Sequence, residues 1–363
     1  MPDRQPDHGL PPMAAPARGT DALGETPRPA HDPASEIIFS ALPAAPLRPE
    51  DILPNRTRNV VGIDVTLSQF PYVGHAETTF VSHDGAELAL AVFRRRGDTA
   101  TGPLFFHIHG GGMVGGTHHD GLVPYLGHLG RHGGAVVSVD YRLAPEHPAP
   151  TPVEDCYSAL TWTIDRAHAF GVNPDQVILD GGSAGGGLAA GVMLLARDRG
   201  GPPLLGVLLE CPMLDDRNDS PSIRQFFHGG GGAWSGASNE VGWGALLGAA
   251  RGTDAISPYD APARATWLGG LPPVHLSVGS TDPFRDEDVA FASAIWRDGG
   301  DCELHVVPGG PHGHDGIAPH TAIARSTAAA RAAWVDRLLN PDDPAMALAQ
   351  RDRILAYFRG TTE

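Results

Sequence analysis

Residues 178–190, ILDGGSAGGGLAA, constrain the fold more than any other stretch of the chain. The β-prone residues 177–179 run into a turn of small residues, and the Ala, Gly, Leu and Met pattern that follows predicts a tightly packed helix over about 184–197. The turn contains a G-x-S-x-G motif with Ser183 at its centre. In a strand-to-helix turn, this motif holds the serine on a sharp, strained bend with its hydroxyl exposed. The alternative is an ordinary glycine-rich turn, and the rest of the chain decides between the two.

Strand and helix patterns alternate on both sides of this turn. We expect strands at 77–81, 88–93, 104–109, 135–141, 177–179, 204–209, 274–278 and 303–307, and helices at 153–170, 184–197, 287–296 and 322–339. The first two strands flank His-Asp-Gly and read as a hairpin. This alternation predicts an α/β fold with a mostly parallel central sheet, helices on both faces and antiparallel strands at the start.

The two ends of the chain differ from this pattern. Residues 1–35 contain eight prolines and almost no large apolar side chains, so we expect a flexible, proline-rich arm. Residues 341–363 follow a proline break and have an amphipathic helical pattern. We interpret them as a C-terminal helical extension that either covers a sheet edge or contributes to a homodimer.

A long excursion also interrupts the alternation. Residues 215–267 lie between two strands, contain no β pattern and include four consecutive glycines, which makes them too long for a simple connection. Residues 36–70 are apolar but broken by proline. We interpret 36–70 and 215–267 as a mainly helical cap region over a catalytic domain formed by 71–214 and 268–340.

The composition limits the classes of partner. With 26 basic and 42 acidic residues, the net charge of −16 disfavours nucleic acids and anionic membranes. The sequence contains no run of 18 apolar residues, so we expect no membrane insertion. The N-terminus lacks a signal-peptide pattern, and we therefore expect a cytoplasmic protein. Cys156, Cys211 and Cys302 are expected to be buried free thiols. No phosphate loop, dinucleotide fingerprint or metal-ligand spacing is present, so we expect no cofactor and no metal.

A serine nucleophile requires a base, and the base requires an orienting carboxylate. Asp282 stands just past the strand at 274–278, and His312 stands just past the strand at 303–307. Asp282 alone also fits a helix cap, and His312 alone also fits a polar residue in a glycine-rich loop. Both together, in the order Ser, acid, His, predict a catalytic triad. Asp286 and His314 are the competing acid and base.

The glycines after the strand at 104–109 are candidates for stabilising an oxyanion. His109-Gly-Gly-Gly112 directly follows this strand, and glycines there let backbone N–H groups point at a carbonyl oxygen. The N–H of Ala184 adds a third donor. His109 is expected to brace this loop, whereas the following histidines are expected to be structural: His107, His118, His119 and His132.

Five motifs in order resemble the hormone-sensitive-lipase family of α/β-hydrolase-fold serine esterases over roughly 80–339: HGGG at 109–112, YRLAPEHP at 141–148, the elbow with its Ala-Gly-Gly, DPFRDE at 282–287 and HG at 312–313. This resemblance implies an α/β-hydrolase fold with a cap, a triad of Ser183, Asp282 and His312, and oxyanion donors from Gly111, Gly112 and Ala184. Two positions depart from the family pattern. Gly182 replaces a usually acidic residue, and His314 replaces a usual aromatic residue.

The resemblance implies a serine carboxylesterase that forms an acyl-enzyme. The aromatic residues within 215–267, together with a pocket of fixed depth, predict short- to medium-chain, fairly apolar esters. The same triad also serves an amidase, lactonase or acyltransferase. A non-catalytic ligand-binding relative, as plant gibberellin receptors are, typically lacks a triad member. Six apolar side chains are candidates for the substrate pocket, with the alternative that they form a core of the cap: Met113, Val114, Phe226, Phe227, Trp234 and Trp243.

Overall fold

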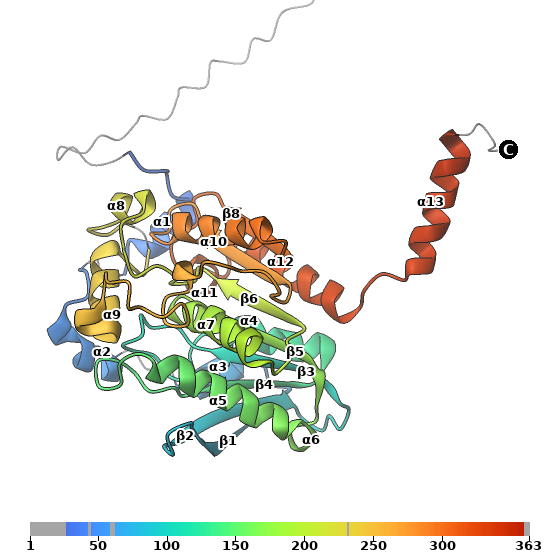
Figure 1. Cartoon of the computed structure of the whole chain (residues 1–363), viewed down its shortest axis with the longest axis horizontal. Coiled ribbons are helices and arrows are strands. Elements are labelled where there is room, and N and C mark those ends of the chain that lie inside the picture. The colour runs from blue at the N-terminus through green and yellow to red at the C-terminus, as the bar shows by residue number, and fades with distance from the viewer. Residues whose placement is uncertain (1–26, 43–44, 59–61, 231, 359–363) are drawn as a thin grey trace, which may run out of the picture.

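An eight-stranded sheet runs through the molecule in the order β1-β2-β4-β3-β5-β6-β7-β8 (Figure 1). The structure is a computed structural model that describes residues 27–42, 45–58, 62–230 and 232–358. β2 pairs antiparallel with β1 and β4, and all later neighbouring pairs are parallel. The strands are β1 (Val73–Val81), β2 (Glu87–Arg95), β3 (Gly102–Ile108), β4 (Ala135–Val139), β5 (Val172–Gly182), β6 (Gly206–Glu210), β7 (Val274–Gly279) and β8 (Cys302–Val307). The predicted α/β fold is confirmed.

Helices cover both faces of the sheet and create two apolar cores. One core contains side chains of α5, α7 and α10, and the other contains side chains of α4 and α12. The helices of this layer arrangement are α4 (Val123–His132), α5 (Thr151–Asp165), α6 (Ala167–Phe170), α7 (Ala184–Arg199), α10 (Arg285–Arg297), α11 (His314–Ile317) and α12 (Ala322–Leu339).

Two helical details differ from the sequence prediction. The helix expected over 153–170 is divided, because α5 ends at Asp165 and α6 begins at Ala167. The helix α4 was not predicted, since its sequence VPYLGHLGRH combines two glycines with two histidines, which are weak helix formers. Tertiary packing supplies the missing stability, for example the stacking of His128 on Phe105 with ring centroids 5.0 Å apart.

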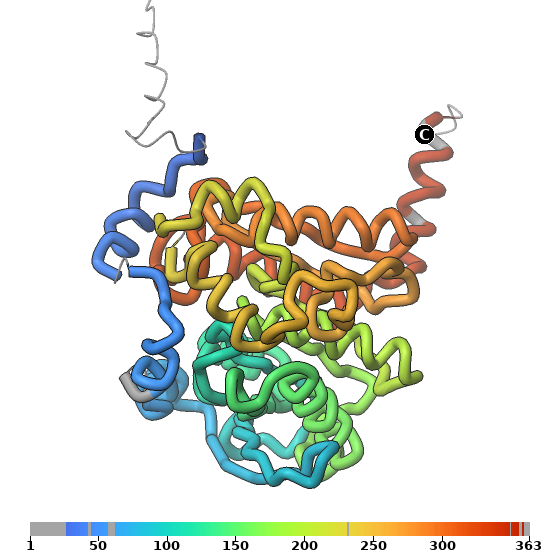
Figure 2. The backbone as a smooth tube through the Cα atoms, turned by 60° about the vertical axis from the view of Figure 1, so that its left-hand side comes forward, coloured from blue at the N-terminus to red at the C-terminus, as the bar shows by residue number. Residues whose placement is uncertain are grey.

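The long excursion and the N-terminal segment contact each other at one side of the molecule (Figure 2). Leu47 N donates to Ser238 Oγ at 3.0 Å, and Gln225 Nε2 donates to Pro27 O at 2.6 Å. The described part of the excursion contains α8 (Pro221–Gln225), α9 (Gly236–Leu247), η2 (Gly248–Ala250) and η3 (Pro262–Arg264), and the N-terminal segment contains α1 (Pro33–Phe39), η1 (Pro49–Asp51), α2 (Ile52–Arg58) and α3 (Ile63–Ser68).

The structure describes the C-terminal extension but only part of the N-terminal arm. Residues 1–26 of the predicted flexible arm lie outside the described residues. The predicted C-terminal helix is α13 (Pro344–Phe358), which projects away from the body in Figure 1 and therefore covers no sheet edge there. Its large exposed apolar residues are Met346, Leu348, Ile354, Leu355 and Phe358. The homodimer remains a prediction.

Two further expectations concern cysteines and membranes. All three cysteines are unpaired; Cys156 and Cys302 are buried, and Cys211 is half-buried. Burial raises the pKa of the Cys302 thiol to about 12. No helix in the described ranges combines the length and the apolar character needed to cross a bilayer.

Two buried histidines make a prediction about stability and pH. Burial lowers the pKa of His128 and of His275 to about 3 each. In the unfolded chain a histidine has a pKa of about 6.5, so the unfolded state binds protons first as the pH falls. The stability that each neutral ring contributes is therefore complete above about pH 6.5 and declines towards pH 3. By about pH 5 the loss amounts to roughly 2 kcal/mol for each histidine.

The variant His128→Phe keeps a ring stacked on Phe105 and removes this proton site. Its free energy of unfolding in urea should fall less between about pH 7 and pH 5 than that of the wild type. An identical fall in both proteins would contradict the assignment of this pH dependence to His128.

Candidate active site

Ser183 follows the last residue of β5 and is the N-cap residue of α7. Its φ of 57° and ψ of −123° are strained for a residue with a side chain. Hydrogen bonds hold this conformation, because Ser183 N donates to Glu210 O at 2.8 Å and Met213 N donates to Ser183 O at 2.9 Å. At Gly185 a Cβ would lie 2.0 Å from Ile108 O, so only glycine permits the helix to start this close to β3. The predicted elbow is present.

The structure brings Ser183, His312 and Asp282 into one hydrogen-bonded chain. His312 Nε2 lies 3.0 Å from Ser183 Oγ, and His312 Nδ1 lies 2.9 Å from Asp282 Oδ2. Because an ionised carboxylate only accepts, Nδ1 carries the proton and Nε2 presents its lone pair to the serine. Asp282 is fully buried, and the edge-on ring of Phe284 packs on the His312 ring with centroids 5.0 Å apart. These contacts fix both rings and carboxylate in one arrangement.

The competing acid and base have other partners. Asp286 accepts from Ser222 N at 2.8 Å and pairs with Arg285, while His314 Nε2 lies 3.0 Å from Thr327 Oγ1. The helix-cap interpretation of Asp282 is wrong, because Phe284 is the N-cap residue of α10 and no side chain caps this helix. The Oδ1 atom of Asp282 instead accepts from Phe284 N at 2.8 Å. Neither competitor is therefore in the serine–histidine chain.

The glycine-rich loop after β3 presents backbone donors beside the serine. Gly111 and Gly112 have φ angles of 119° and 64°, and a Cβ at Gly110 would lie 3.4 Å from Ser183 Cβ. Among the described residues, the N–H groups of Gly111, Gly112 and Ala184 donate to no protein acceptor. The three predicted donors are thus available for an oxygen that develops negative charge next to Ser183.

His109 supports the glycine loop through its contacts with Gly110 and Tyr141, as expected. Its ring stacks on Tyr141 with centroids 4.2 Å apart, and its Nδ1 lies 2.8 Å from Gly110 O. Tyr141 donates its hydroxyl to His109 O at 2.9 Å. Burial lowers the pKa of His109 to about 4, so the ring is neutral at physiological pH and donates from Nδ1 to the carbonyl.

A buried acidic group beside the elbow was missed from the sequence. Glu210 pairs in register with Gly182 across β5 and β6. Its carboxylate accepts from Arg331 Nε at 2.7 Å and from Ser277 Oγ at 2.5 Å, and Arg331 also binds Asp315. The acidic side chain at this level of the sheet therefore comes from β6, and a Cβ at Gly182 would lie 3.7 Å from Glu210 Cβ, in ordinary van der Waals contact. Arg331 stands in an apolar helical pattern, and no local motif reveals that it is buried.

A pocket of about 470 Å³ contains Ser183, His312 and the first two loop glycines. Its walls come from α4 through Val123 and Tyr125 and from α11 through Ile317. A second cavity of about 260 Å³ also reaches Gly111, with Val114, Trp234 and Ile52 among its lining residues. The glycine loop thus borders two cavities.

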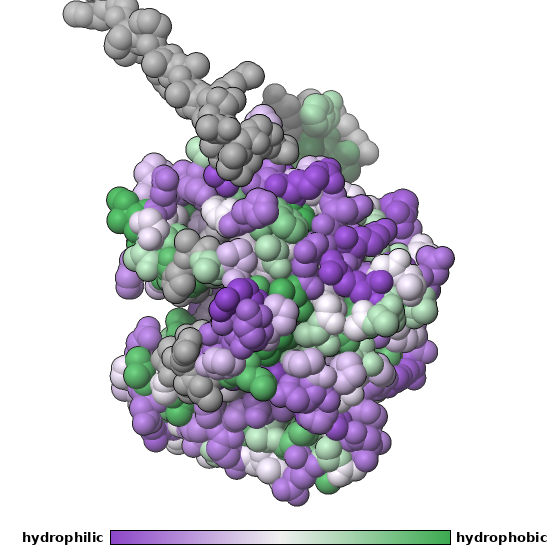
Figure 3. Space-filling view, turned by 90° about the vertical axis from the view of Figure 1, so that its left-hand side faces the viewer, coloured by the Kyte–Doolittle hydropathy of each residue, from purple (hydrophilic) through white to green (hydrophobic). Residues whose placement is uncertain are grey.

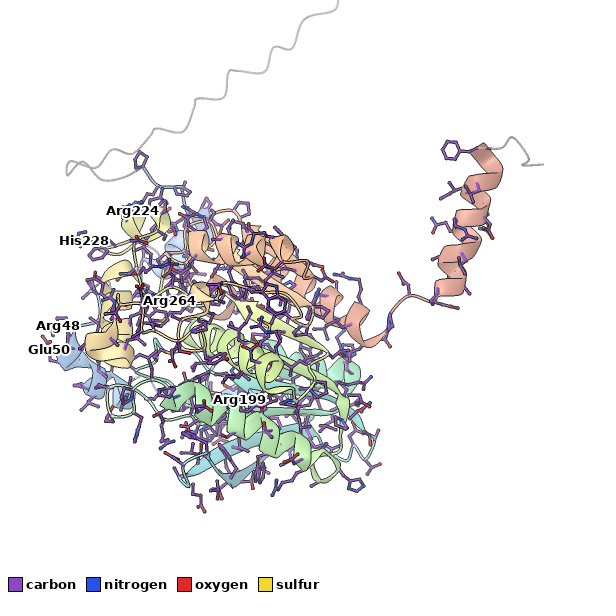
Figure 4. All side chains as sticks on the ribbon, viewed as in Figure 1. Arg48, Glu50, Arg199, Arg224, His228 and Arg264 are labelled. Carbon is purple, nitrogen blue, oxygen red and sulfur yellow. The ribbon has the colours of Figure 1, made fainter. Side chains whose placement is uncertain are left out.

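The excursion crosses directly over these groups. Gly232 forms a β-bridge with His312, and Ala233 N donates to His312 O at 3.4 Å. Two residues further on, the Trp234 ring lies where a Cβ at Gly112 would be only 2.3 Å from it. The segment therefore passes from the base to the oxyanion loop. Polar residues of the excursion such as Arg224 and His228 point outward at the margin of the molecule (Figure 4).

The six predicted pocket residues divide into two groups. Met113, Phe226 and Trp243 are fully buried, and Phe227 is half-buried against the same core. Val114 and Trp234 line the cavity of about 260 Å³, and none of the six lines the pocket that contains Ser183. Figure 3 views the side of the molecule on which α2 and α9 lie and shows apolar side chains between hydrophilic ones there. Cap packing thus accounts for most of these aromatic residues.

Comparisons with known proteins agree on one family. The family Abhydrolase_3, described as alpha/beta hydrolase fold, matches residues 105–315, which include Ser183, Asp282 and His312. Esterase LipI of Mycobacterium tuberculosis (strain ATCC 25618 / H37Rv) is 32% identical over 232 residues, which are 61% of this chain and 68% of the relative. Carboxylesterase NlhH of the same strain is 32% identical over 226 residues, which are 60% and 67% of the two chains.

Solved structures of esterases are similar to this chain over a larger share of its length. Bacterial Heroin Esterase superimposes with a TM-score of 0.79 at 33% identity and covers 86% of this chain and 98% of its own. Esterase LipW from Mycobacterium marinum superimposes with a TM-score of 0.76 at 29% identity and covers 86% of this chain and 99% of its own.

The geometry predicts selective labelling of Ser183. An organophosphate such as diethyl 4-nitrophenyl phosphate should phosphorylate Ser183 Oγ, because His312 accepts the hydroxyl proton during attack. His312→Ala should slow labelling by a factor of about 10² or more, the usual contribution of a general base, whereas His314→Asn should label at nearly the wild-type rate. Mass spectrometry of the peptide containing Ser183 measures the label. Labelling of another serine, or slow labelling only in His314→Asn, would contradict the arrangement.

Proposed function

Because the chain belongs to the alpha/beta hydrolase fold family Abhydrolase_3, the hormone-sensitive-lipase-like family, it is a carboxylesterase, and we propose that it works through an acyl-enzyme on Ser183. Two contacts support this mechanism: His312 Nε2 lies 3.0 Å from Ser183 Oγ, and His312 Nδ1 lies 2.9 Å from Oδ2 of the buried Asp282. These distances suit proton transfer without rearrangement.

In the proposed reaction, Ser183 Oγ attacks the ester carbonyl carbon while His312 Nε2 takes its proton. Asp282 stabilises the resulting imidazolium through Nδ1. The carbonyl oxygen becomes negative and accepts N–H bonds from Gly111, Gly112 and Ala184. His312 then donates its proton to the departing alcohol, and water repeats the sequence on the acyl-enzyme to release the acid.

We propose that the two cavities at Gly111 receive the two halves of a small, fairly apolar ester. The larger, of about 470 Å³, lies in the range of small-molecule sites, and the smaller measures about 260 Å³. The segment from Gly232 to Trp234, which contacts both His312 and Gly112, acts as the part of the cap nearest the reacting carbonyl. The small volumes of the two cavities favour short- to medium-chain acyl groups.

The mechanism predicts the effect of removing the nucleophile or the acid. Ser183→Ala should lower kcat by about 10⁴-fold or more, and Asp282→Asn by about 10⁴-fold, because the imidazole loses its orienting acceptor. Asp286→Asn is the matched control and should keep kcat within about tenfold. Hydrolysis of a 4-nitrophenyl ester measures kcat, and circular dichroism checks folding. A Ser183→Ala enzyme with a tenth of the wild-type kcat would refute the nucleophile.

The cavity sizes predict the acyl-chain profile. Each buried CH₂ contributes about 0.8 kcal/mol, so kcat/KM for 4-nitrophenyl esters should rise roughly fourfold per carbon and then fall once the cavity is filled. Trp234→Ala enlarges the cavity of about 260 Å³ beside Gly111 and should move the maximum to longer chains. The buried Trp243→Phe should lower stability and leave the profile unchanged. An unchanged maximum in Trp234→Ala would show that the acyl chain binds away from Trp234. Faster turnover of amides or lactones than of esters would favour those compounds as substrates.

A further inference from the structure

Three histidines gather around one glutamate at the edge of the sheet, remote in sequence from the catalytic residues. His75 Nε2 and His119 Nε2 lie 2.6 and 2.8 Å from Glu77 Oε1. His118 Nε2 lies 3.1 Å from the other oxygen, Glu77 Oε2. His75 and Glu77 stand two residues apart on the same side of β1, the edge strand at the bottom of Figure 1, and the other two come from the loop after the oxyanion glycines.

The ligand types and their spacing fit a transition-metal ion. His75, Glu77 and His119 each offer an atom, and these atoms lie within 4.8 Å of one another. Two imidazoles and one carboxylate are a familiar Zn²⁺ ligand set, with bonds of about 2 Å and therefore ligand atoms about 3.3 Å apart. To reach this spacing, the present contacts of 2.6 and 2.8 Å need to open by about 0.7 and 0.5 Å. All three side chains reach solvent. Mg²⁺ and Ca²⁺ prefer oxygen ligands alone.

A second layer of contacts orients these groups. His118 holds the free oxygen of Glu77, and its own Nδ1 lies 3.0 Å from Asp140 Oδ1. The His75 ring stacks on Phe93 of the neighbouring strand with centroids 4.9 Å apart. Carboxylates and packing of this kind fix the orientation of ligands around bound metals. The second oxygen of Glu77 and the ring of His75 are therefore held by neighbouring groups.

Two other groups of three candidate ligands occur among the described residues, and neither is as suitable. Cys211, Asp282 and His312 include the catalytic pair. In the group of His275, Glu303 and His305, the His275 side chain is fully buried beneath α12. In the cluster on β1, by contrast, the side chains reach solvent and their ligand atoms lie close together.

We propose that His75, Glu77 and His119 form a binding site for a divalent first-row transition ion such as Zn²⁺, with His118 and Asp140 as positioning residues. The ion would tie β1 to the loop at residues 116–121. Gly116 and Asp120 of this loop line the catalytic pocket, and His107 lies 3.0 Å from Asp120 O. The role of the ion would be structural, since it would hold in place a loop that forms one wall of the pocket.

Calorimetric titration of the chelator-treated full chain with Zn²⁺ tests the proposal. The wild type should bind one ion at this site, and Zn²⁺ should raise its unfolding midpoint, since a ligand that binds the folded state stabilises it. The double variant His75→Ala/His119→Ala and the milder Glu77→Gln should each lose at least about tenfold in affinity and most of the midpoint shift. Glu77→Gln keeps the size of a partly exposed side chain and so guards against a folding defect.

The matched control is His168→Ala, which removes an exposed histidine of α6 and should bind Zn²⁺ like the wild type. Co²⁺ in place of Zn²⁺ should give the visible absorption of a four-coordinate ion in the wild type and lose it in both cluster variants. Absence of Zn²⁺ binding by the wild type, or equal affinity in the wild type and Glu77→Gln, would overturn the proposal and leave Glu77 as an acceptor of three N–H groups only.

Discussion

The left-handed backbone at Ser183 is the constraint on which the rest of the site depends. A φ of 57° turns the chain from β5 into α7 within one residue, and it persists because Glu210 O and Met213 N hold the serine backbone. The turn has room only because Gly185 lies against the end of β3. This backbone conformation therefore places the hydroxyl at the carboxyl edge of the sheet, where the loops after β3, β7 and β8 begin.

Those loops bring distant residues to Ser183, for example His312, which lies 129 residues further along the chain. The parallel register of β5, β6, β7 and β8 places the ends of these strands side by side, so Asp282 and His312 reach the serine without any long excursion of their own. Burial of Asp282 keeps water away from its contact with His312. The segment that contains Ala233 and Trp234 closes the arrangement over the base and the glycine loop.

The glycine loop connects the chemistry to the opposite edge of the sheet. At one end its N–H groups face the proposed oxyanion, and His109 and Tyr141 support it. A few residues later, His118 and His119 meet Glu77 on β1. The same loop therefore contacts the edge strand through His118 and His119 and lines the catalytic pocket through Gly116 and Asp120.

The sequence alone determined the elements whose signals are local: the elbow, the strand and helix alternation, and the strand-end positions of Asp282 and His312. Such signals arise from residues within one turn or one strand. Only the tertiary structure decided that Glu210 and Arg331 pair beneath the elbow, that Phe226 and Trp243 belong to the core while Trp234 faces Gly112, and that α4 is helical. These outcomes depend on contacts between distant segments, and neither segment by itself shows which partner a given side chain will meet.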